Sequence, residues 1–259
     1  MVVRDNRTKQ KMAAGQPALG VSMTIPDMFV VEAIGAAGFD FVLIDTEHAP
    51  IPIDALERML VALRASESTV FVRPAANDST LIGQILDLGV EGVVVPDVRD
   101  AAQCAAAVAA TRYPPTGERG FGPRRAARLD GGRAQYIARA DEEIAAFVMI
   151  EHVDAVAGID AILKTPGLDG IMVGPADLAI SMGHLHDLTH PAVQAAVDRV
   201  FAACERHSFP FGIFAAAEPS ARLWVRRGAR FATVGADTQF IDQGLARTKS
   251  LIAELRPAD

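Results

Sequence analysis

A short stretch near residue 45 combines carboxylates with an imidazole. The segment FDFVLIDTEHAP (39–50) begins as an apolar run suited to a buried strand and ends in Asp45, Thr46, Glu47 and His48. Histidine is the side chain whose ordinary pKa lies near neutrality. His48 is therefore the natural candidate for a proton carrier, and the acidic residues beside it indicate proton or metal chemistry.

Two more carboxylates follow other apolar runs. Glu151 ends AFVMIE (146–151), and Asp177 lies in GPADL (174–178) after GIMVG. No cysteine is near either one. Oxygen ligands with open coordination positions suit Mg²⁺ or Mn²⁺ better than a closed zinc site. We predict that Glu151 and Asp177 hold such an ion, with water and substrate oxygens completing it.

Arginine and backbone groups supply the remaining chemistry. Arg73 ends the run TVFVRP, and a guanidinium can stabilise a developing oxyanion through paired, charge-assisted hydrogen bonds. The GPADL segment reads as the start of a short helix, because Pro175 is tolerated at a first helical position. The backbone N–H groups around Gly174, Pro175 and Ala176 are predicted to cradle a carboxylate or phosphate.

Eight short β-rich runs must position these groups. They are mostly continuous rather than alternating, as is typical of parallel strands covered on both faces. Helical stretches with apolar residues at about 3.6-residue spacing lie between them, at 53–66, 79–89, 101–112 and 191–207. The predicted strands cover 18–23, 40–45, 69–74, 92–98, 146–151, 170–174, 211–215 and 230–235.

About eight βα units in one chain of this length predict an α/β fold, a single closed (β/α)₈ TIM barrel over residues 1–259, with 1–15 as an N-terminal arm. The carboxyl ends of barrel strands form the active-site face, so the polar residues named above should converge on one mouth. The longest irregular segment, 112–132, is rich in Gly, Pro and Arg. We predict that it is a functional loop after the fourth strand.

Composition excludes several classes of protein. The formal charge is −7 and no cluster of Lys and Arg exceeds a pair such as Arg124–Arg125, which argues against a nucleic-acid partner. No stretch approaches the ~20 apolar residues of a membrane span. Cys104 and Cys204 lie in alanine-rich stretches of helical pattern, which predicts that both are packed free thiols. We expect a cytoplasmic protein without a membrane partner.

An ordered series of segments resembles a known family. The segments are GFDFVLIDTEHAP, VRPAANDS, ILDLGVEGVVVPDV, RYPPTGERGFG, VMIE, LDGIMVGPADLA and VGADTQ. In this order, over roughly residues 18–250, they resemble the metal-dependent pyruvate aldolases of the HpcH/HpaI (4-hydroxy-2-oxoheptanedioate aldolase) family. The resemblance implies reversible retro-aldol cleavage of a 4-hydroxy-2-oxo acid to pyruvate, or hydroxypyruvate, and an aldehyde. It also implies a divalent metal, Mg²⁺ or Mn²⁺ with Co²⁺ as a third option, and a homo-oligomer, usually a hexamer, whose last helix swaps between subunits.

The resemblance assigns roles to individual residues. It matches Glu151 and Asp177 to the metal carboxylates and Arg73 to the arginine on the keto oxygen. It matches His48 with Asp87 to a proton-transfer dyad, and Asp45 to a second acidic group near the site. The backbone at Gly174–Ala176 matches the cradle for the substrate carboxylate. Asp45 and Asp87 receive their roles from the resemblance alone.

Two positions depart from the family pattern. Met149 stands where many members have Gln, which removes a hydrogen bond near the pyruvate oxygens. Phe214 ends the seventh strand where a smaller Leu is common, which would narrow the mouth and alter the choice of aldehyde. Both are predicted to line the substrate site.

Three rival functions deserve comparison. A Schiff-base aldolase needs a lysine at the mouth, but Lys164, the candidate nearest a strand, precedes the sixth strand and should lie at the opposite face. A citrate-lyase-like or malyl-CoA-lyase-like C–C lyase would use a similar metal site and would need positive charge for coenzyme A, such as Arg124 and Arg125. A non-catalytic 2-oxo-acid-binding barrel would have no use for a proton carrier beside a metal.

Overall fold

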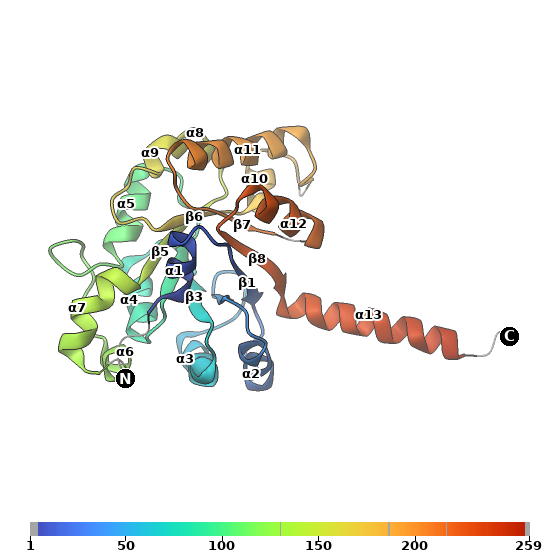
Figure 1. Ribbon diagram of the computed structural model, residues 1–259, viewed down its shortest axis with the longest axis horizontal. Helices are drawn as coiled ribbons and strands as arrows, with labels where there is room; N and C mark the ends of the chain where they lie inside the picture. Colours follow the sequence, from blue (N-terminus) through green and yellow to red (C-terminus); the bar gives the residue numbers. More distant parts are fainter. Residues whose placement is uncertain (1–4, 130, 186, 216, 257–259) are drawn as a thin grey trace.

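Eight parallel strands close into a barrel in chain order, so the predicted (β/α)₈ fold is confirmed (Figure 1). The computed structural model describes residues 5–129, 131–185, 187–215 and 217–256. The strands are β1 (Ala18–Met23), β2 (Phe41–Asp45), β3 (Thr69–Arg73), β4 (Gly92–Val95), β5 (Ala145–Ile150), β6 (Gly170–Val173), β7 (Phe211–Phe214) and β8 (Phe231–Ala236). Each lies within a predicted run or overlaps nearly all of it.

The helices surround this barrel, and several start at an aspartate. Asp27, Asp78 and Asp100 each accept backbone N–H groups of the first helical turn, which satisfies donors that the helix itself leaves unpaired. The helices are α1 (Arg7–Ala13), α2 (Met28–Ala36), α3 (Ile53–Ala62) with the 3₁₀ turn η1 (Leu63–Ala65), α4 (Ser79–Asp87), α5 (Ala101–Ala109), α6 (Arg124–Leu129), α7 (Arg133–Glu143), α8 (Val153–Ala157), α9 (Ile159–Ile162), α10 (Pro175–Ser181), α11 (Pro191–Arg206), α12 (Glu218–Arg227) and α13 (Asp237–Leu255).

The barrel interior is filled by aromatic rings near the start of the strands. Phe41, Phe71, Phe147 and Phe231 are fully buried there, and the rings of Phe41 and Phe231 stack with centroids 4.0 Å apart. Gly92 provides room, since a Cβ at this position would overlap the ring of Phe71. This packed layer forms a floor, so polar groups in the barrel can gather only beyond it, at the carboxyl ends of the strands.

Helix α1 closes the amino-terminal end of the barrel. The fully buried Asn6 side chain caps α1 by accepting from the Lys9 N–H, and donates to the carbonyls of Glu91 and Glu143 at 2.8 Å. Met12 packs against the interior aromatic cluster. The described part of the predicted N-terminal arm, from residue 5 on, therefore lies against the barrel, whereas residues 1–4 are outside the described range.

The segment 112–132 is not a loop at the carboxyl end of the fourth strand, so that prediction is wrong. Helix α5 comes between β4 and this segment, which connects α5 to α7 and contains α6. Arg112 donates to the Ile144 carbonyl, just before β5, and Arg119 pairs with Asp87 at the end of α4. These contacts place the segment at the amino-terminal end of the barrel, away from the mouth.

The last helix, α13, runs outward from the barrel (Figure 1). Its first residue, Asp237, is buried and accepts from the backbone N–H groups of Thr24 and Ile25, at 2.6 and 2.7 Å. The rest of the described helix is mostly exposed, including Leu245 at 64% and Leu255 at 74%. Across the described residues, no helix is long and apolar enough to cross a membrane.

Candidate active site

The end of β2 is shaped by Asp45. Asp45 is only 3% exposed. Its carboxylate accepts from the backbone N–H groups of Glu47 at 3.0 Å and His48 at 3.2 Å. An aspartate that bonds backbone groups two and three residues on forms a local turn. This turn leads the chain out of the barrel. Because it fixes the backbone of Glu47 and His48, Asp45 positions both side chains.

Asp45 also holds Arg73 on the neighbouring strand. The two residues are register partners on β2 and β3, and the arginine donates from Nε to Oδ1 at 3.0 Å and from Nη2 to Oδ2 at 2.6 Å. Burial opposes both charges, but the hydrogen bonds and mutual attraction outweigh it. The pKa of Asp45 is consequently lowered and that of Arg73 raised, so the pair stays ionised.

Glu47 lies between this pair and the imidazole. Its Oε2 is 3.3 Å from Arg73 Nε and 3.4 Å from His48 Nε2, yet it is buried and no described residue gives it a well-formed hydrogen bond. Burial raises the pKa of Glu47, and the charge of Asp177 acts in the same direction. The His48 side chain is 57% exposed at the rim. The sequence drew attention to Glu47 but assigned it no role.

Glu151 is held from β4. It is 7% exposed, and its Oε1 accepts from the backbone N–H of Asp97 at 2.7 Å. Asp97 has φ of 51°, a left-handed conformation that is uncommon outside glycine. Burial raises the pKa of Glu151 to about 7, with Glu47 and Asp177 adding repulsion. The sequence did not indicate a role for Asp97, because its contact with Glu151 is made by the backbone N–H and not by the side chain.

The start of α10 approaches Glu151 closely. A Cβ at Gly174 would lie 2.8 Å from Glu151 Oε2 and 2.9 Å from Met149 Cε, so only glycine fits there. The Gly174 N–H is already used by the Ile150 carbonyl, at 3.2 Å, and Pro175 has none. Of the predicted backbone cradle, the N–H groups that remain for a ligand are those of Ala176 and its successor Asp177.

The two residues that depart from the family pattern line the same region. Met149 is buried in the interior cluster beneath the mouth, 1% exposed, and brings a thioether where a polar amide would donate. The ring centroid of Phe214 lies 5.8 Å from the guanidinium carbon of Arg73. Phe214 is partly buried and packs against the same cluster, so it forms one wall beside the arginine.

Asp87 lies away from the mouth of its own barrel. It is the last residue of α4, at the amino-terminal end of the barrel, and its Oδ1 accepts from Arg119 Nη2 at 3.0 Å. His48 lies at the mouth, where its Nε2 is 3.4 Å from Glu47 Oε2. Within one chain, therefore, the structure does not bring the predicted His48–Asp87 dyad together.

The donor set of the mouth fits a divalent cation completed by other ligands. Glu47 and Glu151 each interact with the charges of Asp177 and of one guanidinium, Arg73, and Glu47 also interacts with that of Asp45. Within the described ranges, no three His, Cys, Asp or Glu side chains are gathered so as to enclose an ion. Two carboxylates with an excess of negative charge leave positions for water and substrate oxygens, as Mg²⁺ sites usually do.

Comparison with known proteins identifies the family. The model of the HpcH/HpaI aldolase/citrate lyase family matches residues 23–243. The chain belongs to this family. The match begins in β1 and ends within α13, so it includes every strand end described above.

The relatives are aldolases with the same barrel. The chain is 39% identical over 232 residues to 5-keto-4-deoxy-D-glucarate aldolase of Klebsiella pneumoniae, which covers 90% of this chain and 91% of the relative. It is 34% identical, with a TM-score of 0.90, to an HpcH/HpaI aldolase/citrate lyase family protein from Burkholderia cenocepacia, covering 97% and 100% of the two chains. An HpcH/HpaI aldolase from Desulfitobacterium hafniense is 29% identical with a TM-score of 0.89, covering 97% and 98%.

These findings confirm the predicted family and the predicted activity class, an aldolase that acts as a carbon–carbon lyase. A Schiff-base mechanism has no support in the geometry. Lys9 and Lys11 pair with Asp169 and Asp40 at the amino-terminal end of the barrel, and Lys164 follows α9.

Proposed function

We propose that this aldolase uses a divalent cation, Mg²⁺ or Mn²⁺, to cleave a 4-hydroxy-2-oxo acid to pyruvate, or hydroxypyruvate, and an aldehyde. The observation that carries the proposal is the group of carboxylates at the mouth, where burial raises the pKa of Glu151 to about 7. Carboxylates crowded in this way gain most from an ion of double positive charge.

Glu151 and Asp177 are the residues that would hold the cation. Glu151 already has one oxygen fixed by Asp97, which orients the other toward the start of α10, where Asp177 lies. When bound, the cation would act as a Lewis acid on the 2-keto group of the substrate. Glu47 would add negative charge behind them without closing the open positions.

Arg73 stabilises negative charge on the keto oxygen as the C3–C4 bond breaks. Asp45 occupies its Nε and Nη2, which fixes the plane of the guanidinium and leaves Nη1 for a substrate oxygen. A donor held rigidly before the reaction needs no reorganisation when the charge develops. The N–H groups of Ala176 and Asp177 bind the substrate carboxylate.

His48 carries the proton. In the cleavage direction its imidazole removes the proton of the C4 hydroxyl, the C3–C4 electron pair passes into the enolate, and the same imidazole returns a proton to C3 to give pyruvate. Its exposure at the rim allows it to reach an aldehyde-derived oxygen. Phe214 beside Arg73 limits the size of that aldehyde.

Asp87 enters this mechanism only through a second copy of the chain. It lies at the opposite end of its own barrel from His48, so a dyad of the two requires an oligomer in which Asp87 of one copy reaches the mouth of another. The exposed apolar side chains of α13 support such an assembly.

A citrate-forming or citrate-cleaving lyase is the second candidate. It is favoured by the similarity to the crystal structure of citrate synthase SbnG, which is 30% identical with a TM-score of 0.86 and covers 96% of this chain and 98% of that one. Arg124 and Arg125 lie on α6, away from the mouth of their own barrel, so they would meet coenzyme A only at the mouth of a second copy. A non-catalytic 2-oxo-acid binder is opposed by the aldolase relatives.

The proposed reaction is tested with 5-keto-4-deoxy-D-glucarate, the compound that appears in the names of the aldolase relatives. Cleavage between its methylene and carbinol carbons would release pyruvate, which a lactate dehydrogenase assay detects with Mn²⁺ or Mg²⁺ present. We expect release with metal and none in Glu151→Ala or Asp177→Ala. Normal release by either variant would refute the metal assignment.

A further inference from the structure

A buried arginine cluster lies at the amino-terminal end of the barrel, remote from the mouth. The Arg119 side chain is fully buried; its Nη2 donates to Asp87 Oδ1 and to the Tyr136 hydroxyl, each at 3.0 Å. The guanidinium carbon lies 4.7 Å from the ring centroid of Tyr113 and 5.6 Å from that of Tyr136. We call these four residues the Arg119 cluster.

Several polar groups of the Arg119 cluster lack hydrogen-bond partners among the described residues, which is unusual for a purely structural cluster. Arg119 Nε, Arg119 Nη1 and the Tyr113 hydroxyl are buried, and no described residue accepts or donates a hydrogen bond there. Burying a guanidinium carries a desolvation penalty that one carboxylate only partly offsets. Asp87 is the single carboxylate paired with Arg119 among the described residues.

Arg112, on the same segment, shows what a structural arginine looks like in this fold. It is also buried, but it donates to Thr111 Oγ1, to the carbonyls of Ile144 and Gly167, and to Asp169, all between 2.9 and 3.0 Å. Its contacts join the segment to β5 and β6. The contrast indicates that Arg119 is present for the charge it sets against Asp87 rather than for a network of hydrogen bonds.

Asp87 is fixed on its other side as well, but remains accessible. A Cβ at Gly122 would lie 2.6 Å from Asp87 Oδ2, so the backbone of the segment passes directly against this oxygen. The Asp87 side chain is nevertheless 28% exposed. One oxygen is held by Arg119 and the other is confined by Gly122, so the carboxylate is presented at the surface in one orientation.

We propose that Arg119 is a positioning residue for catalysis, which, with Gly122, holds the Asp87 carboxylate at the surface in the orientation that receives the imidazole of His48 from a second copy of the chain. This inference rests on the proposed function and adds to it a positioning residue at the amino-terminal end of each barrel. Arg119 touches no substrate; it acts through Asp87.

The test measures metal-dependent exchange of pyruvate methyl protons in D₂O, as kcat and KM for pyruvate. The variants are Asp87→Asn, Arg119→Gln, Arg119→Lys, Gly122→Ala and the double variants D87N/R119Q and D87N/G122A. We expect D87N, R119Q and G122A each to lower kcat about 10- to 100-fold, with KM within threefold of the parent. Each double variant should be no slower than D87N alone, since residues that act through one group are non-additive.

Arg119→Lys should recover at least about tenfold of the loss in R119Q, because it keeps the positive charge. Should R119Q fail to fold, R119K and G122A carry the test, since the added Cβ displaces the carboxylate while Arg119 stays. Arg112→Gln is the matched control: it should lower the melting temperature and leave kcat of the folded enzyme near that of the parent.

Losses that multiply in the double variants, or wild-type kcat in D87N or G122A, would overturn the positioning role while leaving the aldolase intact. Equal effects of R112Q and R119Q on kcat would do the same, because they would show a general loss of structure. Absence of exchange in the parent enzyme itself would instead refute the proposed function, and this inference with it.

Discussion

The mouth of this barrel holds more carboxylates than its own cations can neutralise. Glu47 is the clearest case, because its buried Oε2 lies near Arg73 and His48 without a well-formed hydrogen bond from any described residue. Arg73 is already committed to Asp45. A buried carboxylate without full compensation raises its pKa or binds a cation. The cation that we propose at the mouth would supply this missing compensation.

Glu151 makes the stability of the metal-free protein depend on pH. Its pKa, about 7 in the folded chain against 4.5 ordinarily, means that the folded state binds the proton more tightly than the unfolded state. This stabilisation is complete below pH 4.5 and is lost as pH rises through 7. Between pH 5 and 8, we expect the metal-free protein to lose roughly 2.5 kcal/mol of stability relative to Glu151→Gln.

The measurement is urea unfolding of both proteins in chelator at the two pH values. Glu151→Gln keeps the shape of the side chain and removes its titration, so its own pH dependence reports all other groups. Mg²⁺ at pH 8 should restore stability to the parent and have little effect on the variant. Parallel pH profiles for the two proteins would contradict a raised pKa at Glu151.

Arg73 tests the role of the paired hydrogen bonds. Arg73→Lys keeps the charge but loses the planar fork that Asp45 fixes. We expect pyruvate methyl exchange to fall by about two orders of magnitude, in line with the loss of one rigid donor to a developing oxyanion. Arg58→Lys, in the exposed pair with Asp54 on α3, is the control and should exchange at the parent rate. An unchanged rate in R73K would exclude Arg73 as the oxyanion donor.

Side chains at strand ends were predictable from the sequence, whereas backbone contributions were not. Glu151 and Arg73 stand out because charged residues terminate apolar runs. Asp97 contributes a backbone N–H in a left-handed conformation, for which a valine-rich run followed by Pro-Asp gives no warning. The Gly174 N–H is similarly withdrawn by Ile150, a contact that only the folded barrel reveals.

At the scale of elements, the strands were predictable because parallel strands buried on both faces are continuous apolar runs. The placement of 112–132 was not, because helix α5 ends at Ala109 and the segment then returns along the other end of the barrel. Its composition predicted a functional loop at the mouth, and the segment lies at the opposite end of the barrel. Only the contacts of Arg112 and Arg119 place it.

Helix α1 is predicted to stabilise the barrel without taking part in catalysis. The side chain of Asn6 caps α1 and donates to two backbone carbonyls at the amino-terminal end of the barrel. Asn6→Ala removes the cap and the hydrogen bonds to the carbonyls of Glu91 and Glu143, which should cost about 2–3 kcal/mol. Thermal unfolding should show the loss, while the exchange rate at low temperature stays at the parent level. A variant with parent stability would mean that α1 is not anchored there.

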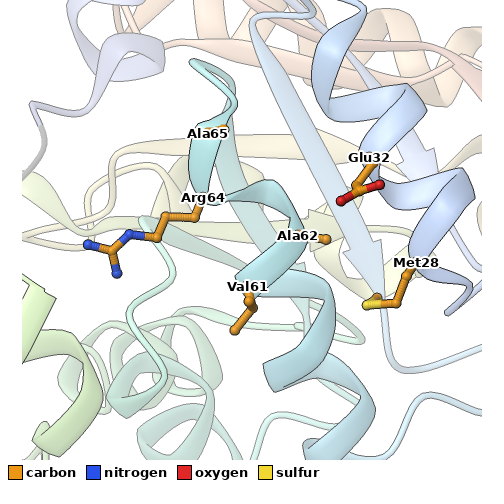
Figure 2. A pocket seen from close by; sticks show the side chains of 6 residues that line it. All are labelled: Met28, Glu32, Val61, Ala62, Arg64 and Ala65. Carbon is orange, nitrogen blue, oxygen red and sulfur yellow. The ribbon is translucent and has the colours of Figure 1, made fainter.

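At the scale of the whole molecule, one chain exposes apolar surface that a second copy could cover. Helix α13 carries Leu245, Leu251 and Leu255 at its surface. Between α2 and α3 lies a groove of about 580 Å³, with Met28 and Glu32 on one side and Val61 on the other (Figure 2). Apolar stripes of this kind usually mark protein contacts.

Leu245→Glu is predicted to weaken assembly without unfolding the barrel. Leu245 is 64% exposed in one chain, so the charge costs little there but would be buried in an oligomer. Light scattering after size exclusion should show a smaller particle, and exchange activity should fall because the proposed dyad joins His48 of one copy to Asp87 of another. Arg247→Glu, two residues further along α13 and therefore on another face of the helix, is the control. An unchanged particle mass in L245E would remove α13 from the interface.

We propose that the mouth generates a pyruvate enolate when Glu151 and Asp177 hold a divalent cation. NMR of pyruvate methyl-proton exchange in D₂O, with Mg²⁺ or Mn²⁺ and again with chelator, tests this without knowledge of the aldehyde. We expect exchange that needs the cation and disappears in Glu151→Ala and Asp177→Ala. Exchange that persists in chelator, or none with either ion, would contradict it.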